Sequence, residues 1–538
     1  LEVLGQEFGG GGGAPVLPAE RKSVATHSIN NRRSNNTSTM LRCVAIAHAL
    51  LHAQALLAPR TPLKAAPVPT TRATRTHAAQ IVIPVRRRRA RLAAVPVQRS
   101  DDGDDDGRPP SLSLDPEVLL VVTCYFLQGA LGLSRLALNF YLKDELGLSP
   151  ADLAALTGLA SAPWVVKPLY GLLSDSTPLL GYRRKSYLAL SGVLGALSFG
   201  AMATVASGTT EALLFANLVA SAAVALSDVV VDSLVVEKAR DEAEAASLQS
   251  VAWGSRYVGA IGAALLSGEA IRVLGARGCF GATAALPLLL TAVALTVREA
   301  PSEERADGAA WREAGAVLGR LKDALLSPEI LRPAAFLFLW QATPNCGSAF
   351  FYFSTASVDA GGLGFDPDFL GRASAAGSVA GLVGVAAYNG LFKEARLSSV
   401  ILWSSVASAI IGLAPLALVS HANRAWGLDD RLFSLGDDVV QSALGEVGFL
   451  PLLVLAAKIC PPGIEGALFA ALMSIFNLGG IVSTEAGALL TDAFHVSETD
   501  FSNLSPLIVT CAASSLLPLF FLGWVRGAED SGDDDVTA

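Results

Sequence analysis

The dominant pattern along the chain is a succession of long apolar segments, each separated from the next by a short polar stretch. A helix that crosses a bilayer needs about 20 mostly apolar residues. After residue 116 the sequence contains twelve segments of about that length, six before a longer polar stretch and six after it. They lie at 117–142, 151–173, 186–206, 211–236, 248–274, 279–297, 331–358, 369–392, 398–420, 432–459, 466–493 and 504–525.

This pattern predicts an all-α membrane protein with about twelve transmembrane helices in two six-helix bundles. We expect a first bundle at 117–297, a polar central linker at 298–330 and a second bundle at 331–525. The composition agrees, because 16% of the 538 residues are charged, against about 25% in soluble domains. Many of the 50 glycines lie inside the segments, where small residues let helices approach closely.

The two ends of the chain differ in composition from these segments. Residues 21–100 contain no Asp or Glu and are rich in Arg, Ala, Thr and Pro, which is typical of an organellar transit peptide. A disordered basic tail on an anionic membrane surface is the alternative. We therefore expect a disordered leader at 1–100, an acidic linker at 101–116 and an acidic tail at 526–538.

Lys and Arg are concentrated in alternate connections between the segments. The connections after the second, fourth and eighth segments carry them, as does the central linker. Short loops rich in Lys and Arg stay on the cytoplasmic side of a membrane. Both termini are therefore expected in the cytoplasm, or in the stroma if the membrane is a chloroplast envelope.

Polar residues inside the apolar segments form stripes along single helix faces. Charged side chains at membrane depth cost at least ~2.5 kcal/mol and generally face a cavity or a partner. Two interpretations remain open, a polar cavity between the helices or interhelical salt bridges that hold or gate the bundle. The candidate solute-binding residues are Gln128, Arg135, Asp228, Asp232, Gln249, Arg256, Gln341 and Asn345.

Residue types that support catalysis or metal binding are not grouped in the chain. The six cysteines are too far apart to form a metal-ligand pair, and the six histidines lie outside the segments or at their edges. We predict no catalytic residue, no metal site and no cofactor, which disfavours a membrane enzyme. The basic leader has no interleaved aromatic residues, so nucleic acid is not an expected partner.

The end of the second segment carries a glycine, an acid and a basic cluster. The sequence reads GLLSD at 171–175 and GYRRK at 181–185. This resembles the loop motif of the major facilitator superfamily, although five residues separate the two parts where that superfamily normally has two. The resemblance implies a gate formed by Asp175, Arg183 and Arg184, in which the carboxylate pairs with Arg183 or with a helix N-terminus.

Longer stretches resemble one branch of that superfamily, the folate–biopterin transporter family of plastids, cyanobacteria and trypanosomatids. The resemblance covers 117–525 and is denser in the first half. The stretches are YFLQGALGLSR (125–135), LSP (148–150), PWVVKPLYG (163–171), SDVVVDSLVVE (227–237), SLQSVAWGSR (247–256), LGD (435–437) and CPPG (460–463).

The resemblance implies a secondary transporter that moves folates or pterins by alternating access, with plant members in the chloroplast envelope. Asp228 or Asp232 would accept hydrogen bonds from the pterin ring, and Arg256 or Arg135 would bind the carboxylates of the folate tail. Protons taken up through Asp228 or Asp232 are the candidate coupling ion, and a monomer in the lipid bilayer is the expected state. A carrier of another small organic anion is the alternative.

Overall fold

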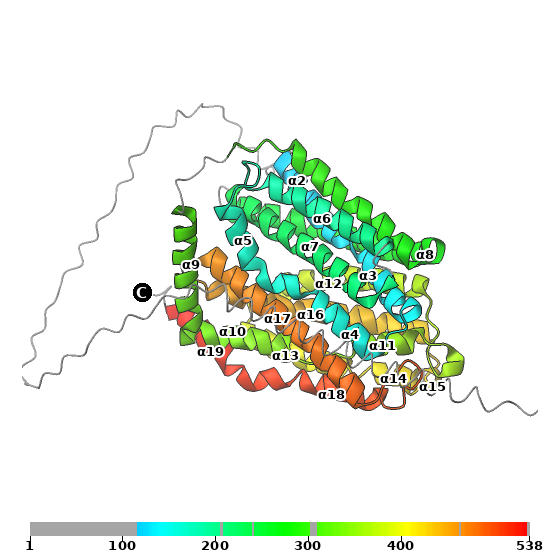
Figure 1. Ribbon diagram of the computed structural model, residues 1–538. Coiled ribbons are helices and arrows are strands. Elements are labelled where there is room, and N and C mark those ends of the chain that lie inside the picture. The colour runs from blue at the N-terminus through cyan, green and yellow to red at the C-terminus, as the bar shows by residue number, and fades with distance from the viewer. Residues whose placement is uncertain (1–115, 205–207, 239–241, 302–308, 462–463, 535–538) are drawn as a thin grey trace, which may run out of the picture. The chain divides into compact units, whose positions relative to one another are not determined.

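The computed structural model describes residues 116–204, 208–238, 242–301, 309–461 and 464–534 (Figure 1). Within these ranges the chain folds into helices joined by loops, without a strand, and all of them belong to one compact unit. The prediction of an all-α membrane protein is confirmed. The predicted leader at 1–100 lies outside the described residues.

Nine helical stretches in the described part are long and apolar enough to cross a membrane. One of them, Val251–Thr296, has 46 residues and contains both the fifth and the sixth predicted segment. The second and seventh predicted segments are not among the nine because each is interrupted. The nine stretches correspond to ten predicted segments, because Val251–Thr296 holds two of them. With the two interrupted segments, the total is the twelve that the sequence predicts.

The first half of the membrane core is built from α2 to α8. The residues that begin its second segment, at the N-terminus of α4, are typical of a helix start. The Ser149 hydroxyl accepts a hydrogen bond from the Asp152 amide at 3.1 Å, and Pro150 occupies the first helical position, which is favourable there. The elements are α2 (Pro116–Ala130), α3 (Gly132–Phe140), η1 (Tyr141–Glu145), α4 (Pro150–Ala160), η2 (Ala162–Val166), α5 (Lys167–Ser176), α6 (Lys185–Ala203), α7 (Thr210–Lys238) and α8 (Glu242–Thr296).

Within α8, a single non-helical residue lies between the arm of the fifth predicted segment and the arm of the sixth. Gly275 has φ 68° and ψ 173°, a backbone conformation that only glycine adopts readily. The chain reverses there without a loop, and the second arm packs along α6 (Figure 1). A Cβ on Gly192 of α6 would lie 2.5 Å from the Pro287 carbonyl oxygen, so this pair of helices depends on a small residue at the contact.

The second half begins with α9 in the central linker, and its first membrane segment is interrupted at 342–346. The elements are α9 (Ala309–Leu326), α10 (Pro328–Gln341), α11 (Gly347–Thr355), η4 (Val358–Ala360), α12 (Pro367–Ala387), η5 (Tyr388–Phe392), α13 (Leu397–Ile411), α14 (Pro415–Val419), α15 (Ala422–Ala425), α16 (Asp430–Lys458), α17 (Glu465–Ala493), α18 (Leu504–Ser514), η6 (Leu517–Phe521) and α19 (Gly523–Asp534).

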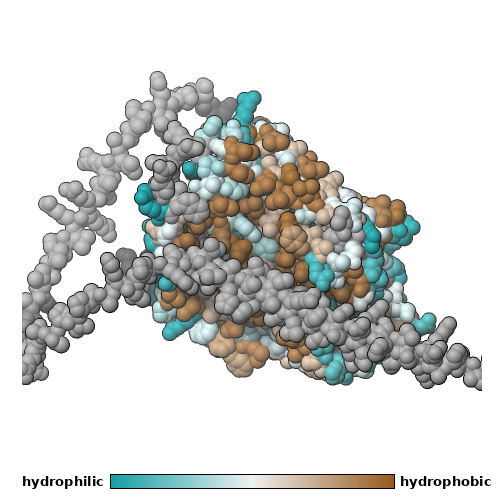
Figure 2. All heavy atoms as spheres, viewed as in Figure 1, coloured by the Kyte–Doolittle hydropathy of each residue, from teal (hydrophilic) through white to brown (hydrophobic). Residues whose placement is uncertain are grey.

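Large apolar side chains cover much of the surface. Phe215, Trp403 and Phe520 are 69%, 69% and 84% exposed, and brown side chains dominate the uncovered part of the face in Figure 2. A water-soluble protein rarely exposes apolar patches of this extent. This surface is suited to contact with lipid.

The two halves contact each other through α4 with α17 and through α8 with α12. A Cβ on Gly158 of α4 would lie 3.1 Å from the Cβ of Thr484 of α17. On the other side of the interface, a Cβ on Gly371 of α12 would lie 2.6 Å from the Ala264 carbonyl oxygen of α8. Glycines therefore let the backbones of the two halves approach closely, as small residues do in membrane bundles.

Candidate functional site

A cavity of about 580 Å³ lies against the inner side of the first half. Ligand cavities in proteins typically measure about 300–1,000 Å³, so this one is large enough for a drug-sized solute. The first half supplies most of the wall, and α11 adds Gly347, Ser348 and Phe351. The polar and charged side chains of the first half that line it are Gln128, Ser134, Arg135, Asn139, Thr157, Ser161, Asn217, Ser221 and Arg256.

Close contact between α2 and α8 brings the predicted residues of these helices together. A Cβ on Gly129 would overlap the carbonyl oxygen of Arg256, and a Cβ on Gly259 would overlap that of Phe126. Only glycine permits the backbones to approach this closely. The contact places Arg256 beside the face of α2 and α3 that carries Gln128 and Arg135, and all three line the cavity.

The two arginines of the cavity, Arg135 and Arg256, form no salt bridge with an acid in the part of the chain that the structure describes. Their positive charges are close enough to interact with each other, and the charge of Arg256 also acts on Asp232 and Glu446. The Arg256 guanidinium lies 5.0 Å from the centre of the Trp253 ring, a favourable position for a cation. An arrangement of two guanidinium groups facing a cavity is suited to an anionic ligand.

Asp228 and Asp232 of α7 are engaged with groups of neighbouring helices. Asp228 forms an ion pair with Lys167 of α5, in which both side chains are largely buried, at 7% and 14% exposed. The Gln128 amide donates a hydrogen bond to the same carboxylate at 3.0 Å, and the Tyr125 hydroxyl donates one to Asp232. Neither acid lines the cavity, and Asp228 is connected to the cavity wall through Gln128.

The remaining predicted binding residues lie elsewhere. The Asn345 amide donates a hydrogen bond to the Ser483 hydroxyl at 3.0 Å, and Gln341 packs against Gly479 and Gly480. Both residues attach the interruption between α10 and α11 to α17, and neither lines the cavity. The side chain of Gln249 lies outside the described residues.

The predicted gate residues lie at the end of α5 and the start of α6. Asp175 pairs with Arg184 at 2.8 Å, rather than with Arg183. Glu299, which follows α8, accepts hydrogen bonds from the backbone amides of Arg183 at 2.7 Å and Lys185 at 2.8 Å. A carboxylate at a helix N-terminus is favourable, so Glu299 fixes the connection between α5 and α6.

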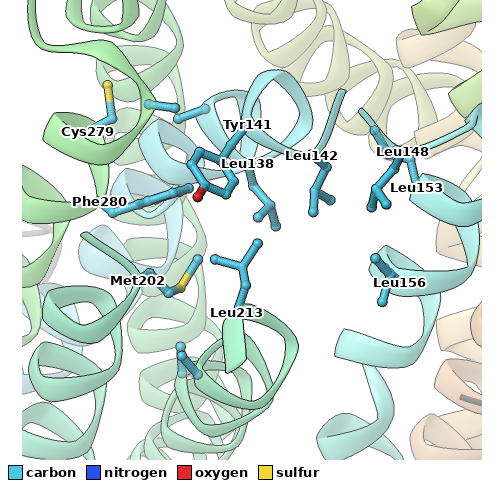
Figure 3. Close-up of a cluster of buried hydrophobic side chains, with 14 of the residues drawn as sticks. Leu138, Tyr141, Leu142, Leu148, Leu153, Leu156, Met202, Leu213, Cys279 and Phe280 are labelled. Carbon is cyan, nitrogen blue, oxygen red and sulfur yellow. The ribbon is translucent and has the colours of Figure 1, made fainter. Parts of the chain in front are cut away.

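An apolar cluster, part of which is drawn in Figure 3, borders the cavity, because Leu138, Leu153 and Met202 belong to both. It consists of first-half residues such as Leu142, Leu148 and Leu156, together with Tyr352 of the second half. The Tyr352 hydroxyl donates a hydrogen bond to the Leu148 carbonyl oxygen, and the rings of Phe140 and Phe351 lie edge to face with centres 5.3 Å apart. The halves are therefore joined beside the cavity.

Several residues of the site were not predicted from the sequence. Trp164 and Thr157 line the cavity, and Lys167 neutralises Asp228. A lysine inside an apolar segment is itself a signal of function, because such charges are costly in lipid. Its partner could not be predicted, since the pairing depends on how the helices pack.

Comparison with known proteins gives close relatives over most of the chain. The chain is 48% identical over 421 residues to the folate-biopterin transporter of Synechocystis sp., an alignment that covers 78% of this chain and 83% of the relative. It is 31% identical over 413 residues to probable folate-biopterin transporter 2 of Arabidopsis thaliana, covering 75% and 81%.

The fold is that of major facilitator transporters. The crystal structure of the nucleoside transporter NupG superimposes with a TM-score of 0.58 at 16% identity, covering 76% of this chain and 98% of that one. At this identity the similarity concerns the fold alone. A model of the protein family described as the BT1 family matches residues 128–537. With that match and the 48% identical relative, the chain belongs to the BT1 family.

Proposed function

We propose that this protein is a secondary transporter that carries folates or pterins across a membrane by alternating access. The observation that carries the proposal is the cavity with two arginines, Arg135 and Arg256, that form no salt bridge with an acid among the described residues. The relatives named above are transporters by name, which agrees with a carrier rather than an enzyme.

The chemistry of the cavity fits the two ends of a folate. The guanidinium groups of Arg135 and Arg256 suit the carboxylates of the glutamate tail, which arginine binds with two parallel hydrogen bonds. The side-chain oxygen of Gln128 is buried and accepts no hydrogen bond from the residues that the structure describes, so it suits an amino group or ring N–H of a pterin. The flat rings of Trp164 and Phe351 also line the cavity and suit stacking on the pterin.

The other predicted residues keep defined places in this proposal. Asp228 acts on the ligand through Gln128, which it holds by a hydrogen bond, and Asp232 stays a prediction as a ligand-binding residue. Gln249, Gln341 and Asn345 stay predictions as ligand-binding residues.

Alternating access requires that the cavity open to one side of the membrane at a time. The apolar cluster around Tyr352 joins the two halves at one end, which the charge distribution of the loops assigns to the side opposite the termini. Asp175, Arg183 and Arg184 gate the other end, where Arg184 holds Asp175.

We place the carrier as a monomer in the inner chloroplast envelope, with both termini in the stroma and protons as the coupling ion. The acid-free, Arg-rich composition of 21–100 supports import into an organelle. An envelope carrier for another small organic anion is the second candidate, because the two arginines recognise carboxylates in general.

Exchange of labelled folate in liposomes that contain the purified protein tests this function. We expect wild-type protein to exchange folate, with biopterin as a competitor and simple dicarboxylates without effect. Arg256→Glu should reduce the exchange at least about tenfold, because a charge-assisted hydrogen bond contributes about 1.5–3 kcal/mol. Arg272→Glu is the matched control, since Arg272 lies on the same helix with 61% of its side chain exposed.

The exchange assay distinguishes a carrier of folates or pterins from a carrier of another small organic anion. Intact folate exchange by Arg256→Glu at normal protein levels would remove the assigned site, and competition by dicarboxylates without any by folate would favour the second candidate.

A further inference from the structure

We propose that Glu446 of α16 carries the coupling proton and that Arg256 is shared between Glu446 and the anionic solute. This inference rests on the proposed function and specifies how transport is driven. It concerns a carboxylate of the second half that faces the cavity arginine of the first half.

Glu446 lies in the middle of α16, where the two halves meet. The Tyr257 hydroxyl of α8 donates a hydrogen bond to the Glu446 carboxylate at 3.1 Å. A Cβ on Gly381 of α12 would lie 3.6 Å from the Glu446 Cγ and 3.7 Å from the Tyr257 ring. Three helices, one from the first half and two from the second, therefore converge on this carboxylate.

The charge that acts on Glu446 comes from the residue next to Tyr257. Burial of Glu446 favours its neutral form, whereas the Tyr257 hydrogen bond and the positive charge of Arg256 favour the carboxylate. The helices α12 and α13, which pack beside this part of α16, present Gly381 and Ser404 there. Among the described residues, no Lys or Arg of the other helices that contact α16 forms an ion pair with Glu446.

This arrangement lets the solute control the proton. With the cavity empty, Arg256 favours the charged form of Glu446, because an opposite charge nearby stabilises a carboxylate. When a solute carboxylate binds Arg256, two negative groups share one cation in a half-buried site. Glu446 then takes a proton from water and becomes a neutral acid, since an unpaired buried charge is costly.

The same contact couples the proton to the motion of the halves. The hydrogen bond between Tyr257 and Glu446 crosses from α8 to α16, so it changes when the halves move relative to each other. A phenol hydroxyl can donate to a carboxylate or accept from a carboxylic acid, so Tyr257 fits both protonation states. On the far side of the membrane the solute leaves, Arg256 again favours the carboxylate, and the proton returns to water.

Asp228 and Asp232 are less suited to this task. Their partners, Lys167 and Tyr125, lie on α5 and α2 of the same half, so movement between the halves leaves these contacts in place. Asp228 is also already neutralised by Lys167, so solute binding does not remove its counter-charge.

Liposomes with a pH gradient test the proposal. We expect wild-type protein to accumulate labelled folate when the outside is acidic, and to exchange folate without a gradient. Glu446→Gln should keep the exchange and lose the gradient-driven accumulation, because glutamine holds the hydrogen bond but cannot release a proton. Asp437→Asn is the matched control, since Asp437 is a partly buried carboxylate of the same helix whose hydrogen-bond partner, Gln441, also lies in α16, and it should keep both activities.

A second measurement does not depend on a variant. Adding folate to purified wild-type protein in weakly buffered detergent solution should make the protein take up about one proton per folate bound, seen with a pH-sensitive dye. Three results would overturn the proposal. The first is folate accumulation by Glu446→Gln in a pH gradient, and the second is wild-type protein that exchanges folate but does not accumulate it in a pH gradient. The third is folate binding without proton uptake. Absence of any folate exchange by wild-type protein would instead refute the proposed function.

Discussion

At the scale of single residues, the ion pair between Lys167 and Asp228 has the greatest effect on the site. Both side chains are largely buried, and the Asp228 carboxylate also holds Gln128 at the cavity wall. Removing both charges of a buried pair is often nearly neutral, whereas removing one leaves the other unpaired. The pair therefore maintains the cavity wall as well as neutralising a charge.

Lys167→Met should destabilise the protein by about 3–5 kcal/mol, because it leaves the Asp228 charge buried without a partner. The double variant Lys167→Met/Asp228→Asn should recover most of that loss. Thermal unfolding in detergent measures both effects, with the exposed Lys393→Met as control. Additive effects of the two substitutions would show that the pair is not coupled.

At this scale the sequence predicted the cavity only in part. Gln128, Arg135 and Arg256 could be identified because spacings of seven residues put polar groups on one face of a helix. Asp228 and Asp232 were identified as polar residues on one face of their helix, but their partners were not, since pairing between distant helices depends on tertiary packing. The interaction of Glu446 with the charge of Arg256 could not be predicted either, because the two residues come together only where the two halves meet.

At the scale of helices, contacts between glycine and backbone determine where the cavity residues lie. Gly129 of α2 packs on the carbonyl of Arg256, and Gly259 of α8 packs on that of Phe126. Each glycine contacts a carbonyl oxygen three residues before the glycine of the opposite helix. The two contacts therefore hold α2 and α8 in one register. The position of the Arg256 side chain in the cavity follows from this register.

Gly129→Ala should separate α2 from α8, because a Cβ at that position would overlap the Arg256 carbonyl. Overpacking of this kind typically costs about 1–3 kcal/mol, and folate affinity should fall with stability. Gly262→Ala in α8 is the control, as nothing lies within 4 Å of its Cβ position. The comparison uses thermal unfolding and folate binding; equal behaviour of the two variants would contradict the role of the contact.

The apolar pattern predicted the helices more completely than the pattern of polar residues predicted the site. Length and composition suffice to recognise a segment that crosses a membrane. They do not reveal an interruption, and the second segment is broken at η2, Ala162–Val166, where Pro163 enters the helix. The boundaries predicted for the two bundles and the central linker stay predictions.

At the scale of the whole molecule, the function depends on contacts between the halves that can open. The apolar cluster with Tyr352 borders the cavity and joins the halves, and α4 contacts α17 through Gly158 and Thr484. A carrier has to break both contacts in each cycle to expose the cavity there. Opening of these two contacts between the halves is therefore a required step of the transport cycle.

A disulfide between α4 and α17 should arrest transport. The Cβ positions of Gly158 and Thr484 are 3.1 Å apart, close to the distance of about 3.5–4.5 Å in disulfides. Gly158→Cys/Thr484→Cys should lose folate exchange after mild oxidation and regain it with a reducing agent, while each single variant is indifferent to oxidation. Exchange that continues in the fully cross-linked protein would show that this interface does not open.

The one-residue reversal at Gly275 has a practical consequence for experiments on this protein. Because the two arms of α8 meet there without a connecting loop, that point offers no chain into which an epitope, a protease site or a fluorophore could be inserted. A reporter intended for the same membrane face belongs between α17 and α18, where residues 498–500 are exposed.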